Sequence, residues 1–380
     1  MSQLELIATA AFGLEAVVSR ELKQLGYANT KTRDGRITFP ADVNAVCRCN
    51  LWLRSADRVL LKLTSFDADD FGALFDQVNA IPWEEWLPID AKFPVRAKSV
   101  RSQLHSEPDI QGLVKKAIVE RLKKTYRRNW FDETGALFPV DVLVLKDEIT
   151  ISIDTSGDGL HKRGYRTLTS QAPLRETLAA ALVQLSYWNR TRPFIDPLCG
   201  SGTIVVEAAL IARNMAPGMN RTFTAQEWPC IPTAAWDAAR EEASSLVADK
   251  PDFTLIGYDQ DDKVLNLARY HAKQAGVFDD VYFQPQEFSQ LSTKRKYGCL
   301  ITNPPYGERL GEAHDVEKLY RQMATVFRDL DHWSIYVLTS HPEFERLVGQ
   351  KADRRRKLYN ARIACTYHQY LGPPPPRSES

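Results

Sequence analysis

The sequence predicts an α/β protein in two parts: an α+β N-terminal half and a C-terminal half with a mostly parallel sheet between layers of helices. Up to about residue 157, short strand and helix patterns alternate at close spacing. From residue 192 onward, short apolar runs alternate with long amphipathic segments, which is typical of crossover connections in a parallel sheet. A glycine-rich, basic segment, GDGLHKRGYRTLTSQAP at 157–173, connects the two parts.

In the N-terminal half, hydrophobic periodicity predicts each element in turn. Strand patterns occur at 4–10, 35–40, 58–66, 92–102, 138–145 and 148–156. Apolar residues at helical spacing occur at 12–27, 41–56, 69–81 and 109–128. These elements divide into two small α+β units, residues 1–58 and 59–157.

In the C-terminal half, the same reading predicts strands that alternate with long helices. Strands are expected at 192–196, 253–259, 281–285, 297–303 and 333–339. Helices are expected at 171–182, 203–216, 262–276 and 316–330. Residues 158–170 form a linker, 171–371 the second domain, and the proline-rich tail 372–380 is expected to be disordered. Segment 216–252 is an insertion, whose Trp228 and Trp236 suit a core or cover role.

Composition limits the class of protein. The chain has 380 residues, 44% of them hydrophobic, and a formal net charge of +1, so a nucleic-acid surface would have to be a local patch. The start lacks the positive flank of a signal peptide, and no apolar run approaches the roughly 20 residues of a membrane span. The six cysteines form no C-x-x-C framework for zinc or disulfides. We therefore expect a cytoplasmic protein with no metal and no membrane partner.

The first candidate site follows the first strand of the predicted parallel sheet, where such sheets bind ligands. In DPLCGSGT at 196–203, two glycines allow a tight turn close to a ligand and Thr203 begins a helix. The loop lacks the spacing of a dinucleotide motif and the lysine of a P-loop. Asp196 could accept from an ammonium while the amides near Gly200 to Gly202 meet a carboxylate. The alternative is an ordinary glycine-rich strand-to-helix turn.

Two more acidic residues follow the next strands. Asp259 could accept from both hydroxyls of a ribose, unless it caps the next helix, which Asp261 or Asp262 could do instead. Glu287 could accept from the amine of adenine, although an exposed glutamate is often only solvated. An amino acid end, a ribose and an adenine together predict S-adenosylmethionine. The candidate cofactor-binding residues are Asp196, Pro197, Cys199, Gly200, Ser201, Gly202, Thr203, Asp259 and Glu287.

The motif NPPY at 303–306 follows a buried strand and predicts the reaction site. The amine of a nucleobase is a poor nucleophile because its lone pair is delocalised into the ring. Asn303 Oδ1 and the Pro304 carbonyl could accept from this amine, while Pro305 stiffens the corner and Tyr306 stacks on the base. The alternative is a turn, since N-P and P-P are common turn dipeptides.

With DPLCGSGT and NPPY in this order, residues 165–370 resemble class I S-adenosylmethionine-dependent methyltransferases that modify amino groups. The whole chain resembles the bacterial THUMP-domain guanine-N2 methyltransferases of large-subunit ribosomal RNA. ATAAFGLEAVVSRELKQLGY and VRAKSVRSQLHSEPDIQGLVKKAI match the N-terminal parts of that family. Glu287 is a departure, because much of the family carries aspartate at this position.

The resemblance implies a domain for each part of the chain. It implies an N-terminal ferredoxin-like domain at 1–58 and a THUMP RNA-binding domain at 59–157. It implies a Rossmann-like class I methyltransferase domain with a mostly parallel seven-stranded sheet at 171–371. Removing residues 1–157 would then leave cofactor binding intact and abolish RNA methylation.

Basic residues supply the candidate RNA contacts, in the helix around 112–128 and in the connector. They are Lys115, Lys116, Lys123, Lys124, Arg127, Arg128, Lys162 and Arg163. The alternative is a solvated charged surface. A third basic cluster, DRRRK at 353–357, has no assigned role.

The predicted activity is methyl transfer from S-adenosylmethionine to the exocyclic N2 of a guanosine in 23S ribosomal RNA, giving N2-methylguanosine. One alternative is a tRNA guanine-N2 methyltransferase of the same architecture. Another is a non-catalytic RNA-binding or ribosome assembly factor. A DNA adenine methyltransferase shares the motif but leaves the N-terminal half unexplained. The sequence predicts no oligomeric state.

Overall fold

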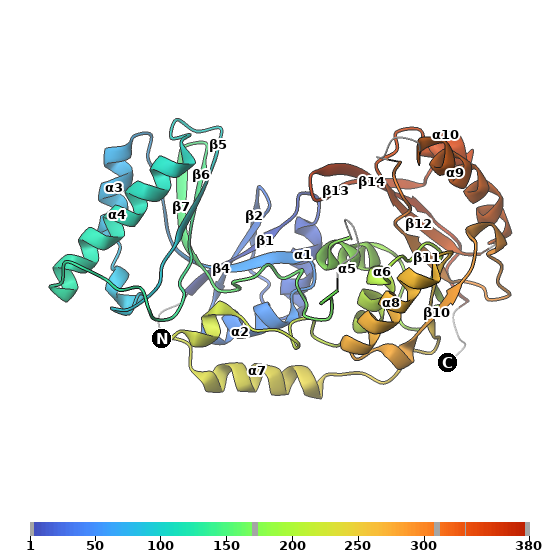
Figure 1. The fold of residues 1–380 in the computed structure, drawn as a ribbon, viewed down its shortest axis with the longest axis horizontal. Helices are drawn as coiled ribbons and strands as arrows, with labels where there is room; N and C mark the ends of the chain where they lie inside the picture. The colour runs from blue at the N-terminus through green and yellow to red at the C-terminus, as the bar shows by residue number, and fades with distance from the viewer. Residues whose placement is uncertain (1–3, 169–173, 308–311, 331, 377–380) are drawn as a thin grey trace.

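The computed structural model describes residues 4–168, 174–307, 312–330 and 332–376, and within them the strands form two seven-stranded sheets. One sheet belongs to the N-terminal half and the other to the C-terminal half (Figure 1). The α/β class and the organisation in two parts are therefore confirmed.

The N-terminal sheet is shared by both predicted α+β units. Its strand order is β2-β3-β1-β4-β7-β6-β5, and β5 and β6 pair in parallel while the other described pairs are antiparallel. The strands are β1 Leu4–Ala10, β2 Lys31–Arg33, β3 Arg36–Ala41, β4 Ala56–Asp67, β5 Val95–Val100, β6 Val140–Leu145 and β7 Glu148–Asp154. Because β4 pairs with β1 at one edge and β7 at the other, the predicted boundary between residues 58 and 59 falls inside a strand.

Helices of the N-terminal half pack against this sheet. They are α1 Glu15–Gln24, α2 Val43–Trp52, α3 Phe71–Ala80 and α4 Glu107–Tyr126, with the 3-10 turn η1 at Trp83–Glu85. Asp42 caps α2 and Asp70 caps α3, each by accepting a 2.9 Å hydrogen bond from an amide of the first turn. α3 and α4 pack together beside β5, β6 and β7, at the far end of the molecule from the C-terminal sheet (Figure 1).

The C-terminal sheet has the strand order β10-β9-β8-β11-β12-β14-β13. Its strands are β8 Phe194–Asp196, β9 Leu255–Asp259, β10 Val281–Pro285, β11 Cys299–Thr302, β12 Ser334–Thr339, β13 Arg354–Asn360 and β14 Ile363–Tyr370. β8 to β12 are parallel, which confirms the mostly parallel prediction, and β14 runs antiparallel to β12 and β13. The hairpin β13–β14 was not predicted, because four consecutive basic residues open β13 and hide any alternation.

Helices cover both faces of the C-terminal sheet, and each face has its own core. α5 Glu176–Leu185, α6 Thr203–Ala212 and α8 Asp262–Gln274 cover one face, and α9 Glu312–Asp329 and α10 Phe344–Val348 cover the other. The 3-10 turns η3 Phe278–Asp280 and η4 Phe288–Gln290 flank β10. Two covered faces explain why the parallel strands read as continuous apolar runs.

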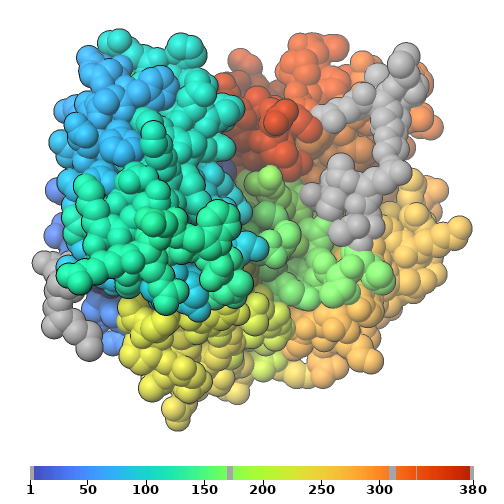
Figure 2. Space-filling model, turned by 60° about the vertical axis from the view of Figure 1, so that its left-hand side comes forward, coloured from blue at the N-terminus to red at the C-terminus, as the bar shows by residue number. Residues whose placement is uncertain are grey.

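The insertion 216–252 packs on the N-terminal half. It contains the 3-10 turn η2 Thr224–Glu227 and helix α7 Thr233–Ser245, and α7 lies against α2 (Figure 1). Trp228 stacks on Phe138 with ring centroids 4.7 Å apart, and Arg48 donates two 2.8 Å bonds to Glu242. Trp228 and Trp236 are buried, as predicted. The space-filling view shows the insertion, in yellow, below the N-terminal half and beside the connector (Figure 2).

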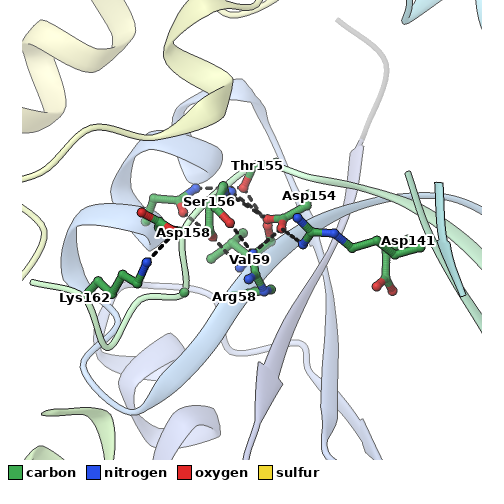
Figure 3. Close-up of polar contacts among 12 residues, drawn as sticks. Arg58, Val59, Asp141, Asp154, Thr155, Ser156, Asp158 and Lys162 are labelled. Atoms are coloured by element: carbon green, nitrogen blue, oxygen red, sulfur yellow. Dashed lines mark hydrogen bonds and ion pairs between the residues drawn. The ribbon is translucent and has the colours of Figure 1, made fainter. Parts of the chain in front are cut away.

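A polar junction holds the start of the connector to β4. Thr155 donates from its amide and its hydroxyl to the Val59 carbonyl, and Val59 N donates to Ser156 Oγ at 2.9 Å (Figure 3). Arg58 pairs with the buried Asp154 carboxylate, whose pKa is raised by burial. Arg221 of the insertion donates to several connector carbonyls, including Gly159 O at 2.7 Å. The connector is therefore a packed element from its first residues.

The predicted tail lies partly outside the described residues, since 377–380 are not described. Gly372, at its start, donates its amide to Ser334 Oγ at 3.2 Å. Among the described helices, each is too short or too polar to cross a lipid bilayer.

Candidate active site

The carboxyl ends of four neighbouring parallel strands, β10, β9, β8 and β11, surround a cavity of about 720 Å³. The cavity contains residues from all the post-strand segments that the sequence singled out. Its lining comprises Leu198, Gly200, Asp259, Gln260, Gln286, Glu287, Phe288, Ser289, Asn303, Pro305, Asp315, Val316, Lys318, Leu319 and Gln322. Parallel strands bring their ends to one edge, so segments about 100 residues apart in sequence meet here.

The loop 196–203 is shaped by the residues around it. Gly202 has φ +79, and a Cβ there would lie 2.9 Å from Ala268 Cβ, so the position requires glycine. The Gly200 amide donates to Asp259 Oδ2 at 3.0 Å, and the Gly202 amide donates to Cys199 O at 2.8 Å. The Gly200 and Gly202 amides, two of those that we expected to meet a carboxylate, thus bond within the protein. Among the loop residues, Leu198 and Gly200 line the cavity, while Cys199, Ser201 and Thr203 are buried.

Asp196 lies beneath the cavity with a side chain that is 1% exposed. Its Oδ1 accepts from Thr302 Oγ1 at 2.7 Å and from the Leu198 amide at 3.2 Å. Burial, with a smaller contribution from the Asp259 carboxylate, raises the pKa of Asp196 to about 7. Contact between Asp196 and an ammonium stays a prediction. In the structure, the Asp196 side chain joins β8 to β11 through its hydrogen bond with Thr302.

Asp259 and Glu287 both line the cavity. Asp259 Oδ2 accepts from the Gly200 amide and Oδ1 accepts from the Asp261 amide at 3.0 Å. Each oxygen retains a lone pair for a further donor. Asp261 caps α8 by accepting from the Lys263 amide at 2.9 Å, so the cap need not come from Asp259. Glu287, after β10, is exposed.

The NPPY corner is held by hydroxyl groups. Tyr306 Oη donates to Asn303 Oδ1, and the Pro305 carbonyl accepts from Tyr320 Oη at 2.9 Å. Burial raises the pKa of Tyr306 well above its usual range, so the phenol stays protonated and can donate. Asn303 and Pro305 line the cavity, and Pro304 is buried. Asn360 of the β13–β14 hairpin donates to Tyr306 Oη at 3.5 Å.

The predicted RNA contacts divide into exposed and engaged side chains. Lys116, Lys124, Arg127 and Arg128 are exposed on α4 or just after it. Lys115 pairs with Glu133 at 2.6 Å, Lys123 pairs with Glu120 at 2.9 Å, and Lys162 pairs with Asp158 at 2.9 Å. The prediction for Arg163 is wrong, because this residue is 3% exposed and pairs with the buried Glu207 carboxylate at 3.4 Å.

Several residues of the site gave no clear signal in the sequence. His271 is buried on α8, with Nδ1 3.0 Å from Ser201 O and Nε2 3.1 Å from Leu168 O, so it connects the loop to the connector. Thr302 precedes Asn303 and Gln286 precedes Glu287, but neither side chain by itself indicated a role in the site. Among the described residues, no group of three His, Cys, Asp or Glu side chains could hold a metal ion.

The strand order, the antiparallel final strand and the cavity at the strand ends define a class I methyltransferase fold. Family models give the same class: an RMKL-like methyltransferase domain matches residues 163–369, an RlmL ferredoxin-like domain matches 5–60, and a THUMP domain matches 68–154. The chain belongs to the RMKL-like methyltransferase family.

Two relatives in sequence illustrate the family. YpsC of Bacillus subtilis (strain 168), named as a candidate RNA methyltransferase, is 46% identical over 97% of this chain and 96% of its own length. The ribosomal RNA large subunit methyltransferase K/L of Syntrophotalea carbinolica is 34% identical over 95% of this chain. The chain spans about half the length of this K/L protein, 53%.

Two solved structures share the fold along nearly the whole chain. A Listeria monocytogenes protein, named as a predicted N6-adenine-specific DNA methylase, has a TM-score of 0.93 and 48% identity, covering 98% of this chain and 97% of its own. SMU.472, a candidate methyltransferase crystallised with SAH, has a TM-score of 0.92 and 41% identity. The match covers 98% of this chain and 99% of the SMU.472 chain.

Proposed function

We propose that this protein transfers a methyl group from S-adenosylmethionine to the exocyclic N2 of a guanosine in 23S ribosomal RNA, giving N2-methylguanosine. The observation that carries the proposal is the single cavity lined both by the acidic residues Asp259 and Glu287 and by the amide residue Asn303. A methyl donor and an amine acceptor must share one cavity, because the transfer is direct.

The cofactor is S-adenosylmethionine, and the cavity offers groups for its parts. Asp259 accepts from the ribose hydroxyls with the lone pairs that its two backbone contacts leave. Glu287 accepts from the adenine amine, and its exposure lets it adjust to the ligand. The loop 196–203 forms the wall beside the methionine end. The SAH bound to SMU.472 supports this use of the fold.

Asn303 and Pro304 bind the amine of the target base. The amine donates to Asn303 Oδ1 and to the Pro304 carbonyl, which directs the nitrogen lone pair to the methyl group. The sulfur–carbon bond breaks as the nitrogen–carbon bond forms, and the proton then leaves the nitrogen for solvent. Tyr306 holds the Asn303 amide through its hydroxyl and presents its ring for stacking. The rigid corner reduces the entropy lost on alignment.

RNA is favoured over DNA by the N-terminal half. Its second unit matches a THUMP domain, and both sequence relatives are named for RNA methylation. Lys116, Lys124, Arg127 and Arg128 remain exposed for phosphate contacts. The name of the Listeria protein points to DNA adenine, and the NPPY corner would accept that amine too. Ribosomal RNA as substrate is consistent with a cytoplasmic protein.

The test is a methylation assay with labelled S-adenosylmethionine on naked 23S ribosomal RNA, 16S ribosomal RNA, tRNA and duplex DNA, followed by nucleoside mass spectrometry. We expect N2-methylguanosine in 23S RNA. Label in tRNA alone would favour the tRNA alternative, and N6-methyladenine in DNA would reject the proposal. Absence of S-adenosylmethionine binding in calorimetry would favour a non-catalytic assembly factor. Mapping of 23S RNA from a deletion strain would then locate the nucleotide.

A further inference from the structure

An exposed aromatic contact lies between the N-terminal half and the reaction corner. Phe12, in the loop between β1 and α1, is 64% exposed. Its ring meets Tyr359 of β13 edge-on, with centroids 5.9 Å apart, and Lys357 Nζ lies 5.6 Å from the centre of the Tyr359 ring. The contact joins residues almost 350 positions apart in sequence.

The backbone is built to hold this contact. Gly13 has φ +91, and a Cβ at this position would lie 2.7 Å from the Lys357 carbonyl. Glycine therefore allows the loop to approach β13 closely. Leu14 and Leu358, the residues that follow Gly13 and Lys357, are both buried in the core of the C-terminal half. Burial of the neighbours fixes the loop while Phe12 itself stays in solvent.

The residue next to this contact in β13 reaches the proposed catalytic residues. Asn360 follows Tyr359 and donates to Tyr306 Oη at 3.5 Å, and Tyr306 in turn donates to Asn303. In Figure 1, β13 extends from the C-terminal sheet toward β1 and α1. Tyr359 is therefore linked to this corner through the backbone of β13, since the side chains of consecutive strand residues point to opposite faces.

Charge indicates the kind of partner. Arg354 donates to Tyr187 Oη at 2.9 Å and Arg355 pairs with Glu345 at 3.5 Å, so both have protein partners. Lys357 is exposed and makes no ion pair within the described part of the chain. Aromatic rings beside an unpaired cation suit bases and phosphates of an unpaired strand.

We propose that Phe12, Tyr359 and Lys357 form an entry platform that binds the unpaired nucleotides next to the target guanosine. The inference rests on the proposed function and adds the ferredoxin-like unit to the substrate site. Bases stack on Phe12 and Tyr359, and Lys357 contacts a phosphate. A base held on the platform keeps the neighbouring purine out of its helix and directed to Asn303.

The experiment compares full-length variants in their affinity for a fluorescent single-stranded RNA, in their kinetics of 23S RNA methylation and in their affinity for S-adenosylmethionine. Phe12→Ala should weaken binding of the single strand about 5- to 150-fold, as expected for loss of base stacking. It should raise KM for RNA and leave S-adenosylmethionine affinity unchanged. Phe12→Tyr should retain binding, because the ring remains.

Matched controls separate the platform from general effects. Phe278, which precedes β10 at the opposite end of the strands from the cavity, has an aromatic ring that is 50% exposed. Phe278→Ala should leave RNA affinity and the kinetics of methylation unchanged. Strand alternation places Arg356 on the face of β13 opposite to Lys357. Lys357→Ala should therefore weaken RNA binding more than Arg356→Ala does.

The outcomes also separate this proposal from the proposed function. Normal RNA binding and methylation by Phe12→Ala would overturn the platform and leave the proposed function standing. Weaker binding of single-stranded RNA by a protein that methylates no RNA would support the platform and reject the proposed function. Equal losses in Lys357→Ala and Arg356→Ala, with none in Phe12→Ala, would indicate general charge attraction and overturn the platform. If Phe12→Ala lowered the melting temperature but left RNA affinity unchanged, Phe12 would have only a structural role. That result would also overturn the platform.

Discussion

At the scale of single residues, the proposed cofactor contacts and the proposed base contacts come from different strands. Asp259 ends β9 and Glu287 follows β10, whereas Asn303 follows β11 and accepts a hydrogen bond from Tyr306. Asp196 is buried beneath these residues and connects β8 to β11 through its hydrogen bond with Thr302. Substitutions in the two sets of contacts should therefore affect different steps.

Asn303→Ala should lower turnover by about 100-fold or more and leave S-adenosylmethionine affinity nearly unchanged, because it removes an acceptor aligned with the reacting amine. Single-turnover methylation and calorimetry measure the two effects. Tyr306→Phe, which loses only the hydroxyl that donates to Asn303, is the matched control and should lose less. Equal losses of turnover and cofactor affinity in Asn303→Ala would contradict the separation of the two sets of contacts.

Asp196 should make stability depend on pH. Its pKa in the folded protein, about 7, is above the ordinary value of 3.8, so the folded state holds a proton that the unfolded chain releases between these values. The contribution of Asp196 to stability therefore falls as pH rises from about 4 to about 7.

Asp196→Asn should remove this pH dependence, because the asparagine oxygen can still accept from Thr302 without carrying a charge. We expect the variant to gain stability relative to the wild type between pH 5 and pH 8, measured by thermal denaturation without cofactor. Parallel pH profiles for the two proteins would show that Asp196 is not protonated in the fold.

At the scale of elements, the insertion 216–252 belongs to the methyltransferase part in sequence but to the N-terminal core in space. Phe223, Trp228 and Trp236 are buried in the same cluster as residues of α2 and β6. Stacking of Trp228 on Phe138 and of Trp236 on Phe223, and the Arg48–Glu242 pair, hold η2 and α7 there. The insertion therefore connects the two halves by packing residues of the C-terminal half into the N-terminal core.

Trp228→Ala should reduce the free energy of unfolding by about 3–5 kcal/mol, because it leaves a cavity and removes the donor to the Leu137 carbonyl. Urea denaturation measures the loss. Trp130→Ala is the control, since Trp130 is 77% exposed and should change stability by no more than about 0.5 kcal/mol. A similar loss of unfolding free energy in both variants would show that burial of Trp228 does not stabilise the fold.

At the scale of the whole molecule, the two halves depend on each other. The expectation that residues 158–380 bind the cofactor alone overlooked the insertion, whose apolar residues are covered by the N-terminal core. Leu14 and Val17 of the N-terminal half also reach into the core of the C-terminal half. Each half covers apolar surface of the other.

Removing residues 1–157 should therefore expose this surface and give an aggregating or partly unfolded fragment with weakened S-adenosylmethionine binding. The full chain should unfold in one calorimetric transition, with both halves melting together. Two separate transitions, or a soluble fragment with the affinity of the full chain, would show that the halves are independent.

Local sequence patterns were enough to predict the parallel strands, most helices and the positions of the site motifs. Apolar periodicity and the residues after each strand are local properties, so DPLCGSGT, Asp259 and NPPY could be located at strand ends without coordinates. The hairpin β13–β14 escaped this reading, because four basic residues hid the alternation of β13. The strand β4 was predicted, but its pairing with strands of both units was not, because such pairing has no local signal.

Which of these residues meet depends on how the elements pack in three dimensions. Arg163 is basic and lies in the connector, but packing buries it against Glu207. Packing also brings Thr302 of β11 within hydrogen-bond distance of Asp196. The insertion and the Phe12–Tyr359 contact depend on pairings across about 90 to 350 residues. Such pairings result from packing of whole elements, which local patterns do not encode.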